Sequence, residues 1–104
     1  MAPESSTLWS PEALADIEKI WDFYARAAGI AVADRMLRDI ARAVSILQTY
    51  PLSGRSRDEV RAGLRSVVAA PNLIFYRVAA HRLQVVRVLD GRRDIDDVFS
   101  GSGG

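Results

Sequence analysis

Two runs of apolar and β-branched residues near the end of the chain constrain its fold more than any other feature. They span residues 73–78 and 83–89, with four residues between them. Runs of this composition that close again after a short turn are typical of a β-hairpin. Each run carries one arginine, Arg77 or Arg87, and the doublet Arg92-Arg93 follows the second. Arginines on a rigid sheet present preorganised donors for phosphate or carboxylate groups, so we expect an anionic partner.

The register of this hairpin decides which face of the sheet each arginine occupies. One register pairs Val78 with Leu83. Arg87 then lies opposite Ile74, and strand alternation places it on the other face from Arg77. A shift of one residue places both arginines on one face. The sequence leaves these two registers open.

Ahead of the hairpin, apolar residues recur at helical spacing in two long segments. Ser10 and Pro11 suit the N-cap and first turn of a helix that ends at Gly29. A second helix begins near Ala31 and ends before Pro51, because the residue before a proline disfavours helical backbone. Together they predict an antiparallel helical hairpin whose apolar stripes need a sheet to cover. The stripes are Leu14, Ile17, Ile20, Trp21 and Tyr24, then Ala33, Leu37, Ile40, Val44 and Leu47, while Glu12, Asp16, Glu18, Lys19 and Asp22 lie mostly on the outer face of the first helix.

The remaining segments complete a prediction of an α+β fold. Residues 7–9 suit a first strand, residues 52–59 a polar loop and residues 64–69 a further strand. We expect an N-terminal strand, an antiparallel helical hairpin packed on a small antiparallel sheet of three or four strands, and a short C-terminal helix or tail. The expected divisions are a flexible leader at 1–6, a single domain at 7–99 and a disordered tail at 100–104.

Composition excludes several classes of function. The chain has 104 residues and no cysteine, which removes disulfides, thiol catalysis and thiolate metal sites. Its longest apolar stretches have the length of a strand, so no segment is expected to span a bilayer. The N-terminus lacks the basic and apolar regions of a signal peptide. We therefore expect a cytoplasmic protein that does not contact a membrane.

Charge is distributed unevenly along the chain. Residues 1–34 contain six acids and two bases, whereas residues 35–104 contain seven acids and twelve bases. Thirteen of the 14 basic residues are arginine, and nine arginines lie within residues 55–93 beside only three acids. A solvated sheet surface is the simplest explanation of this cluster. Because the arginines lie within or beside strands, we favour an anion-binding face.

Five short motifs follow one another along the chain. They are Trp9-Ser10-Pro11-Glu12-Ala13, Pro51-x-x-Gly54-Arg55, Gly63-Leu64-Arg65-Ser66, Phe75-Tyr76-Arg77-Val78 and Arg87-Val88-Leu89-x-Gly91-Arg92-Arg93-Asp94. In order and spacing they resemble the ParE branch of the RelE/ParE toxins, the toxin halves of bacterial type II toxin–antitoxin pairs. The resemblance covers residues 7–99. It implies a helical hairpin on a small antiparallel sheet, in agreement with the elements predicted above.

The resemblance also implies one of two activities. RelE-like members cut messenger RNA on the ribosome, whereas ParE-like members are associated with poisoning DNA gyrase. RNA cleavage needs groups that move protons, and unperturbed arginine is too basic to act as a general base. Lys19 lies in the acidic first helix, and His81, the single histidine, lies in the hairpin turn. Asp90 replaces a histidine that many relatives carry, and Phe99 aligns with their terminal tyrosine.

These departures favour a gyrase inhibitor with no catalytic residue, and make enzymatic activity uncertain. A ribosome-dependent ribonuclease, with Asp90 as base beside Arg93, is the alternative, although such a pair is more often a salt bridge. A non-toxic remnant that only binds antitoxin is the third possibility. No cofactor or metal is expected, because three acids within residues 94–97 usually serve only to solvate the chain.

The resemblance implies a cognate antitoxin as the controlling partner. It is expected to be ParD-like, with a ribbon-helix-helix DNA-binding part, so that DNA is contacted only indirectly. Its acidic, leucine-rich segment is expected to fold over the helices and sheet. The predicted antitoxin-binding residues are Trp21, Tyr24, Arg65 and Arg87, with Arg92 or Arg93 as further partners for its acids. The predicted target-binding residues are Arg65, Arg77, Arg87, Arg92, Arg93 and Phe99.

Overall fold

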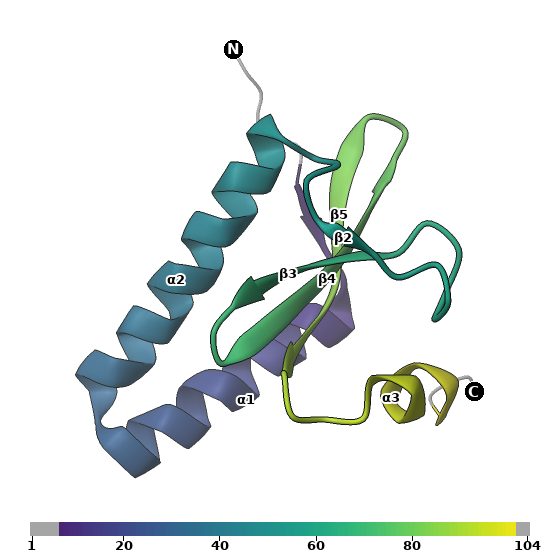
Figure 1. Cartoon of the computed structure of the whole chain (residues 1–104). Coiled ribbons are helices and arrows are strands. Elements are labelled where there is room, and N and C mark those ends of the chain that lie inside the picture. The colour runs from purple at the N-terminus through teal and green to yellow at the C-terminus, as the bar shows by residue number, and fades with distance from the viewer. Residues whose placement is uncertain (1–6, 102–104) are drawn as a thin grey trace.

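A five-stranded sheet with helices on both faces forms the molecule, as the computed structural model shows for residues 7–101 (Figure 1). The strand order is β1-β5-β4-β3-β2, with β1 parallel to β5 and all other neighbours antiparallel. None of the helices in this range is long and apolar enough to cross a membrane. The elements are β1 (Leu8–Trp9), α1 (Pro11–Ala28), α2 (Ile30–Thr49), β2 (Arg55–Ser56), β3 (Arg65–Ala69), β4 (Asn72–Ala79), β5 (Arg82–Asp90) and α3 (Ile95–Gly101).

The predicted α+β class is confirmed, but the sheet is larger than the three or four antiparallel strands expected. The additional strand, β2, has only two residues and lies in the segment predicted to be a polar loop. The sheet is also mixed, because β1 runs parallel to β5. A parallel neighbour needs a long crossover connection, and here the two helices and three strands between β1 and β5 provide it.

The β4–β5 hairpin closes through a tighter turn than the sequence predicted. Ala80 and His81 alone form the turn, with φ angles of 54° and 62°. Positive φ at both central residues is the geometry of a type I′ turn, which matches the twist of the flanking strands. Of the two registers that the sequence left open, the structure has the one that pairs Val78 with Leu83 next to the turn.

A β-bulge then changes the register towards the other end of the hairpin. The pairing shifts between Phe75 and Tyr76, so Arg87 lies opposite Phe75. The pairing of Arg87 with Ile74 that this register implies is therefore not formed, and Ile74 pairs with Val88 instead. An extra residue in one strand is invisible to an argument that counts outward from the turn.

The N-cap of α1 connects this helix to the sheet. Ser10 Oγ accepts a hydrogen bond from Ala13 N at 2.9 Å and donates one to the Val86 carbonyl at 2.7 Å. Gly29, with φ of 100°, is the single residue between α1 and α2. Figure 1 shows the two helices diverging from this connection, and both pack on the same core. The predicted helical hairpin is thus present, with α2 beginning at Ile30.

The core between the helices and the sheet agrees with the prediction for α2 better than for α1. Four of the five predicted α2 residues are buried, and Leu37 is half-buried. In α1, Leu14 is 52% exposed, so its assignment to the core is wrong. The buried residues of α1 are Ala13 and Asp16, although Asp16 was placed on the outer face.

The opposite face of the sheet is covered by α3 and by residues of the loop before β3. Phe99 packs edge-on against Phe75 of β4, with 5.2 Å between ring centroids, and both are buried. Asp94 Oδ1 accepts a hydrogen bond from Asp97 N at 3.2 Å in the first turn of α3. Ser100 and Gly101 belong to α3, whereas the rest of the predicted tail and the predicted leader lie outside the described residues.

Asp16 explains why α1 lies against β5. Its carboxylate accepts hydrogen bonds from Arg87 Nε at 2.8 Å, Arg87 NH2 at 2.9 Å and Val88 N at 2.9 Å. The Asp16 side chain is 7% exposed and that of Arg87 is 20% exposed. The hydrogen bond to Asp16 raises the pKa of Arg87 against the opposing effect of burial. A bidentate, nearly buried ion pair thus joins residues 71 positions apart.

We predict that Arg87→Ala destabilises the protein by about 3–5 kcal/mol, because it leaves the buried carboxylate of Asp16 without its counterion. The free energy of unfolding from urea titration measures this change. The matched control is Arg42→Ala, which removes the exposed ion pair of Arg42 with Asp39 and should cost no more than about 1 kcal/mol. Equal effects of the two substitutions would contradict a structural role for the Asp16–Arg87 pair.

Candidate functional site

The five arginines predicted to bind partners occupy three different environments. The Arg77 side chain is exposed and makes no hydrogen bond or ion pair within residues 7–101. Arg65 NH1 donates to the carbonyls of Leu52 at 3.1 Å and Gly54 at 2.8 Å, so its guanidinium holds the loop before β2. Arg87 is occupied by Asp16. Arg65 and Arg87, which were predicted to bind both the antitoxin and the target, therefore already have structural roles inside the fold.

The loop that Arg65 holds is also fixed by Tyr76. The Tyr76 hydroxyl donates to Pro51 O at 2.8 Å and accepts from Gly54 N at 2.9 Å, and burial raises its pKa. A side chain at Gly54 would collide with the Tyr76 ring, so glycine is required there for the close approach. The Pro51-x-x-Gly54 motif is thus explained by packing rather than by partner binding.

The doublet after β5 forms an exposed basic rim in which Arg92 is oriented by Asp90. Arg92 donates to the Asp90 carboxylate from Nε at 2.9 Å, from NH2 at 2.8 Å and from its backbone N at 2.8 Å. These hydrogen bonds lower the pKa of Asp90 to about 2 and raise the pKa of Arg92. The Arg93 side chain is exposed and makes no hydrogen bond or ion pair in the described part of the chain.

This geometry bears on whether the rim can move protons. A carboxylate with a pKa of about 2 is a weak base at neutral pH. His81 lies at the hairpin turn, and Asp90 lies at the opposite end of β5. Lys19, however, lines the same surface depression as Asp90, although the two residues lie far apart in the sequence. The rim presents positive charge beside a carboxylate that Arg92 already holds.

The surface depression that contains Lys19 and Asp90 lies beside Arg92 and Arg93, and we name it the rim hollow. It has a volume of about 250 Å³ and lies between α1 and the end of the β4–β5 hairpin. Charged groups lie beside aromatic and aliphatic side chains, and Phe23, 59% exposed, contacts Tyr24 edge-on. The lining residues are Asp16, Lys19, Ile20, Phe23, Tyr24, Asn72, Val88, Leu89, Asp90, Arg92 and Arg93.

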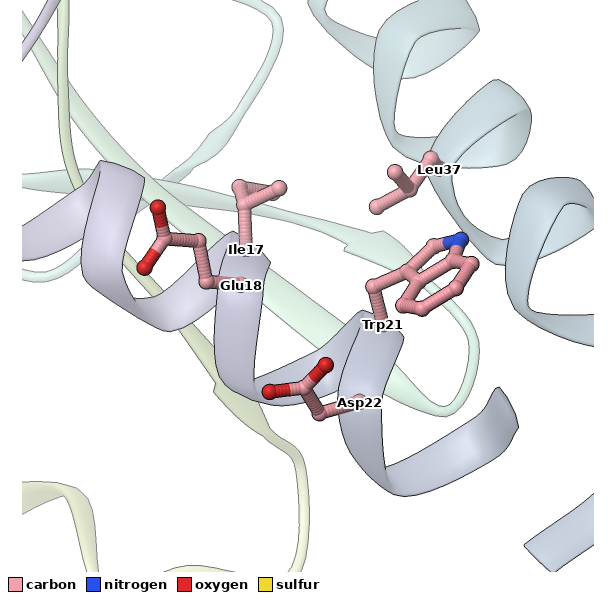
Figure 2. A pocket seen from close by; sticks show the side chains of 5 residues that line it. All are labelled: Ile17, Glu18, Trp21, Asp22 and Leu37. Carbon is pink, nitrogen blue, oxygen red and sulfur yellow. The ribbon is translucent and has the colours of Figure 1, made fainter. Parts of the chain in front are cut away.

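A second depression, the interhelix hollow, lies where α1 faces α2 (Figure 2). It has a volume of about 430 Å³ and is lined by Ile17, Glu18, Trp21, Asp22 and Leu37. Figure 2 shows the Trp21 ring extending towards Leu37, and Trp21 Nε1 donates to Asp34 of α2 at 2.9 Å. Trp21 and Tyr24, predicted to bind one partner together, therefore line different hollows.

Phe99 was predicted to contact a target, but its ring is 7% exposed and belongs to the core under α3. The guanidinium carbon of Arg61 lies 5.1 Å from the centre of this ring. Arg57 similarly lies 5.7 Å from the centre of the Phe75 ring. A target contact by Phe99 would require α3 to move. The roles of Arg57 and Arg61 as cations over aromatic rings had no signal in the sequence.

We predict that Arg92→Ala raises the pKa of Asp90 from about 2 towards its ordinary value of 3.8. Because folding lowers this pKa, the contact stabilises the folded state above pH 3.8 and its contribution is lost as the pH falls towards 2. A carbon-13 NMR titration of the Asp90 carboxyl measures the shift. Arg82→Ala, at the other end of β5, is the control. An Asp90 pKa that stays low in Arg92→Ala would show that another group sets it.

Comparison with known proteins gives a consistent result. The family model described as the ParE toxin of the type II toxin–antitoxin system parDE matches residues 7–95. A toxin named ParE1 from Mycobacterium tuberculosis is 39% identical over 93 residues, which cover 88% of this chain and 95% of that protein. A toxin named ParE3 from Caulobacter vibrioides is 29% identical over 80 residues, covering 77% and 80% of the two chains.

Solved structures share the fold. A chain described as the chromosomal ParDE system from P. aeruginosa has a TM-score of 0.72 and 28% identity, covering 82% of this chain and 94% of that one. A YoeB/ParE toxin from Agrobacterium tumefaciens has a TM-score of 0.59 and 21% identity, covering 83% and 98%, and shows the fold alone. The resemblance predicted from the five motifs is confirmed. The chain belongs to the ParE toxin family of type II toxin–antitoxin systems.

Proposed function

We propose that this ParE-type toxin inhibits DNA gyrase in the cytoplasm and is neutralised by a cognate ParD-like antitoxin. The observation that carries the choice of target class is the Asp90–Arg92 contact. It keeps the carboxylate at the rim ionised and weakly basic, with a pKa of about 2. A rim that attracts anions without a poised base suits binding to a protein or a protein–DNA complex better than cleavage of RNA.

The exposed cations supply the attraction that such binding needs. Arg92 and Arg93 are exposed at the rim, and Arg77 is exposed on β4. Asp90 restricts the Arg92 guanidinium, so less side-chain entropy is lost when a partner binds. Arg65 and Arg87 would have to give up internal hydrogen bonds to reach a partner. We therefore assign the main contacts with gyrase to Arg77, Arg92 and Arg93, and assign Arg65 and Arg87 to positioning.

The likeness of this chain to the chromosomal ParDE system from P. aeruginosa supports an antitoxin partner for it. The interhelix hollow offers an apolar site beside Trp21 and Leu37 for such a partner. A ribbon-helix-helix part in the antitoxin would bring the pair to DNA, which the toxin itself would not need to contact. Copurification with the product of a short neighbouring reading frame tests this part of the proposal.

The test of the target is a DNA supercoiling assay with purified gyrase and purified toxin. We predict inhibition, or accumulation of cleaved DNA, by the unmodified chain. Arg92→Ala combined with Arg93→Ala should weaken the effect by about tenfold or more, because charge-assisted contacts across the interface are lost. Its thermal midpoint should fall only slightly, because the Arg92 side chain is exposed and its contact with Asp90 contributes little to folding. Arg35→Ala combined with Arg38→Ala, on the exposed side of α2, is the charge-matched control.

The alternatives give different results in the same set of experiments. Codon-phased cuts in translated messages after induction, without inhibition of gyrase, would favour a ribosome-dependent ribonuclease. Lys19 beside Asp90 in the rim hollow is the observation that keeps this alternative in the test. Normal growth after induction, with antitoxin binding preserved, would instead identify a non-toxic remnant.

A further inference from the structure

The side chain of Asn72, the first residue of β4, breaks a general rule of protein interiors. It is 1% exposed, yet neither Nδ2 nor Oδ1 has a hydrogen-bond partner within residues 7–101. Buried polar groups are almost always paired, because an unpaired one loses the hydrogen bonds it would make in water. These are the only buried side-chain nitrogen and oxygen atoms in the described range that lack a partner. A leucine, similar in shape and apolar, would be expected to stabilise the free chain more.

The position of Asn72 places its unpaired side-chain amide beside the rim hollow. Its backbone pairs with Ala69 of β3 on one side and with Asp90 of β5 on the other, so it lies at the end of the hairpin. Asn72 lines the rim hollow. A carboxamide offers one acceptor and two donor hydrogens. A peptide group or another carboxamide, which offers a donor and an acceptor side by side, is the matching ligand group.

The charges around the hollow indicate what else the ligand carries. Asp16 is held by Arg87, and Asp90 and Arg92 hold each other. Two cations remain, Lys19 and Arg93, which form no ion pair in the described part of the chain. A ligand with one or two carboxylates next to its amide group would balance them.

The shape of the surrounding surface suits an extended chain. A third hollow, of about 420 Å³, shares Lys19 and Phe23 with the rim hollow and shares Asp22 with the interhelix hollow. The three hollows thus lie next to one another in a series along α1. Glu18 and Asp22 line the interhelix hollow, where they would repel a phosphate backbone. A polypeptide can place apolar side chains there, so a peptide fits the series better than RNA.

We propose that the rim hollow is the docking site for an acidic, extended segment of the antitoxin. An amide group of that segment pairs with Asn72, and its carboxylates lie beside Lys19 and Arg93. This inference rests on the antitoxin partner proposed above and adds Asn72 and Lys19, which are not among the predicted binding residues. The toxin retains an amide that destabilises the free chain because the bound antitoxin supplies the missing hydrogen bonds.

The experiment measures stability and affinity on the same variant. Asn72→Leu should raise the thermal midpoint of the free chain and weaken binding of the antitoxin encoded beside the gene by about tenfold, the loss expected when a buried amide pair is broken. Lys19→Gln should also weaken binding and reduce its dependence on salt. Gln84→Leu, which replaces an amide on β5 outside the hollow, is the matched control and should leave affinity unchanged.

A second readout uses the unmodified chain and does not depend on any variant folding. Asn72 is the single asparagine, and Gln48 and Gln84 are the only glutamines, so the side-chain amide protons are readily assigned by NMR. Addition of antitoxin should shift the Asn72 amide signals most. Unchanged signals, or a lower thermal midpoint of Asn72→Leu with unchanged affinity, would overturn the inference and leave Asn72 as a group that holds only water.

The remaining outcomes separate this inference from the proposed function. Normal antitoxin binding by Asn72→Leu removes the subsite alone and leaves the toxin–antitoxin pair intact. Failure of the unmodified chain to bind the antitoxin removes both. A single-stranded oligoribonucleotide that shifts the Asn72 signals and competes with the antitoxin would overturn the choice of a peptide as ligand.

Discussion

The buried ion pair between Asp16 and Arg87 is the contact on which the functional surface depends. It fixes one turn of α1 against β5 through three hydrogen bonds. Residues three, four, seven and eight positions after Asp16 then lie on the same side of the helix. Among them are Lys19, Phe23 and Tyr24, which line the rim hollow. A charge pair inside the fold therefore sets the position of an aromatic and cationic surface outside it.

The arginines of this chain show that the number of cations does not measure the size of an anion-binding face. Arg65 holds a loop, Arg87 holds a helix, and Arg57 and Arg61 lie over aromatic rings. Guanidinium is suited to these roles because it is planar, always charged and able to donate several hydrogen bonds. What remains for a partner is a smaller set at the rim and on β4. The cluster of arginines in the sequence thus contains some that stabilise the fold and others that are available to bind a partner.

Regular spacing of large apolar residues predicted buried positions correctly. Features without a regular spacing, such as a buried ion pair or a β-bulge, were not predicted. The stripe of α2 repeats large apolar residues at helical spacing, and four of its five members are buried. In α1 the buried positions are Ala13, which is small, and Asp16, which is polar, so hydrophobicity pointed to the exposed Leu14 instead. The partner of Asp16 lies 71 residues away, and no local pattern indicates such a pair. The hairpin was predicted, but its bulge was not.

The candidate site was predicted only in part, because only some of its residues belong to a recognisable pattern in the sequence. Arg92 and Arg93 follow a strand, so their place at its exit could be read from order alone, whereas Asn72 has no distinguishing pattern around it. Its importance follows from an environment that only the folded chain creates, a buried amide without a partner beside unpaired cations. Natural sequences agree with local rules nearly everywhere, and departures concentrate where function opposes stability. A lone departure at the border between the core and a cationic hollow is therefore more informative about binding than any of the exposed arginines.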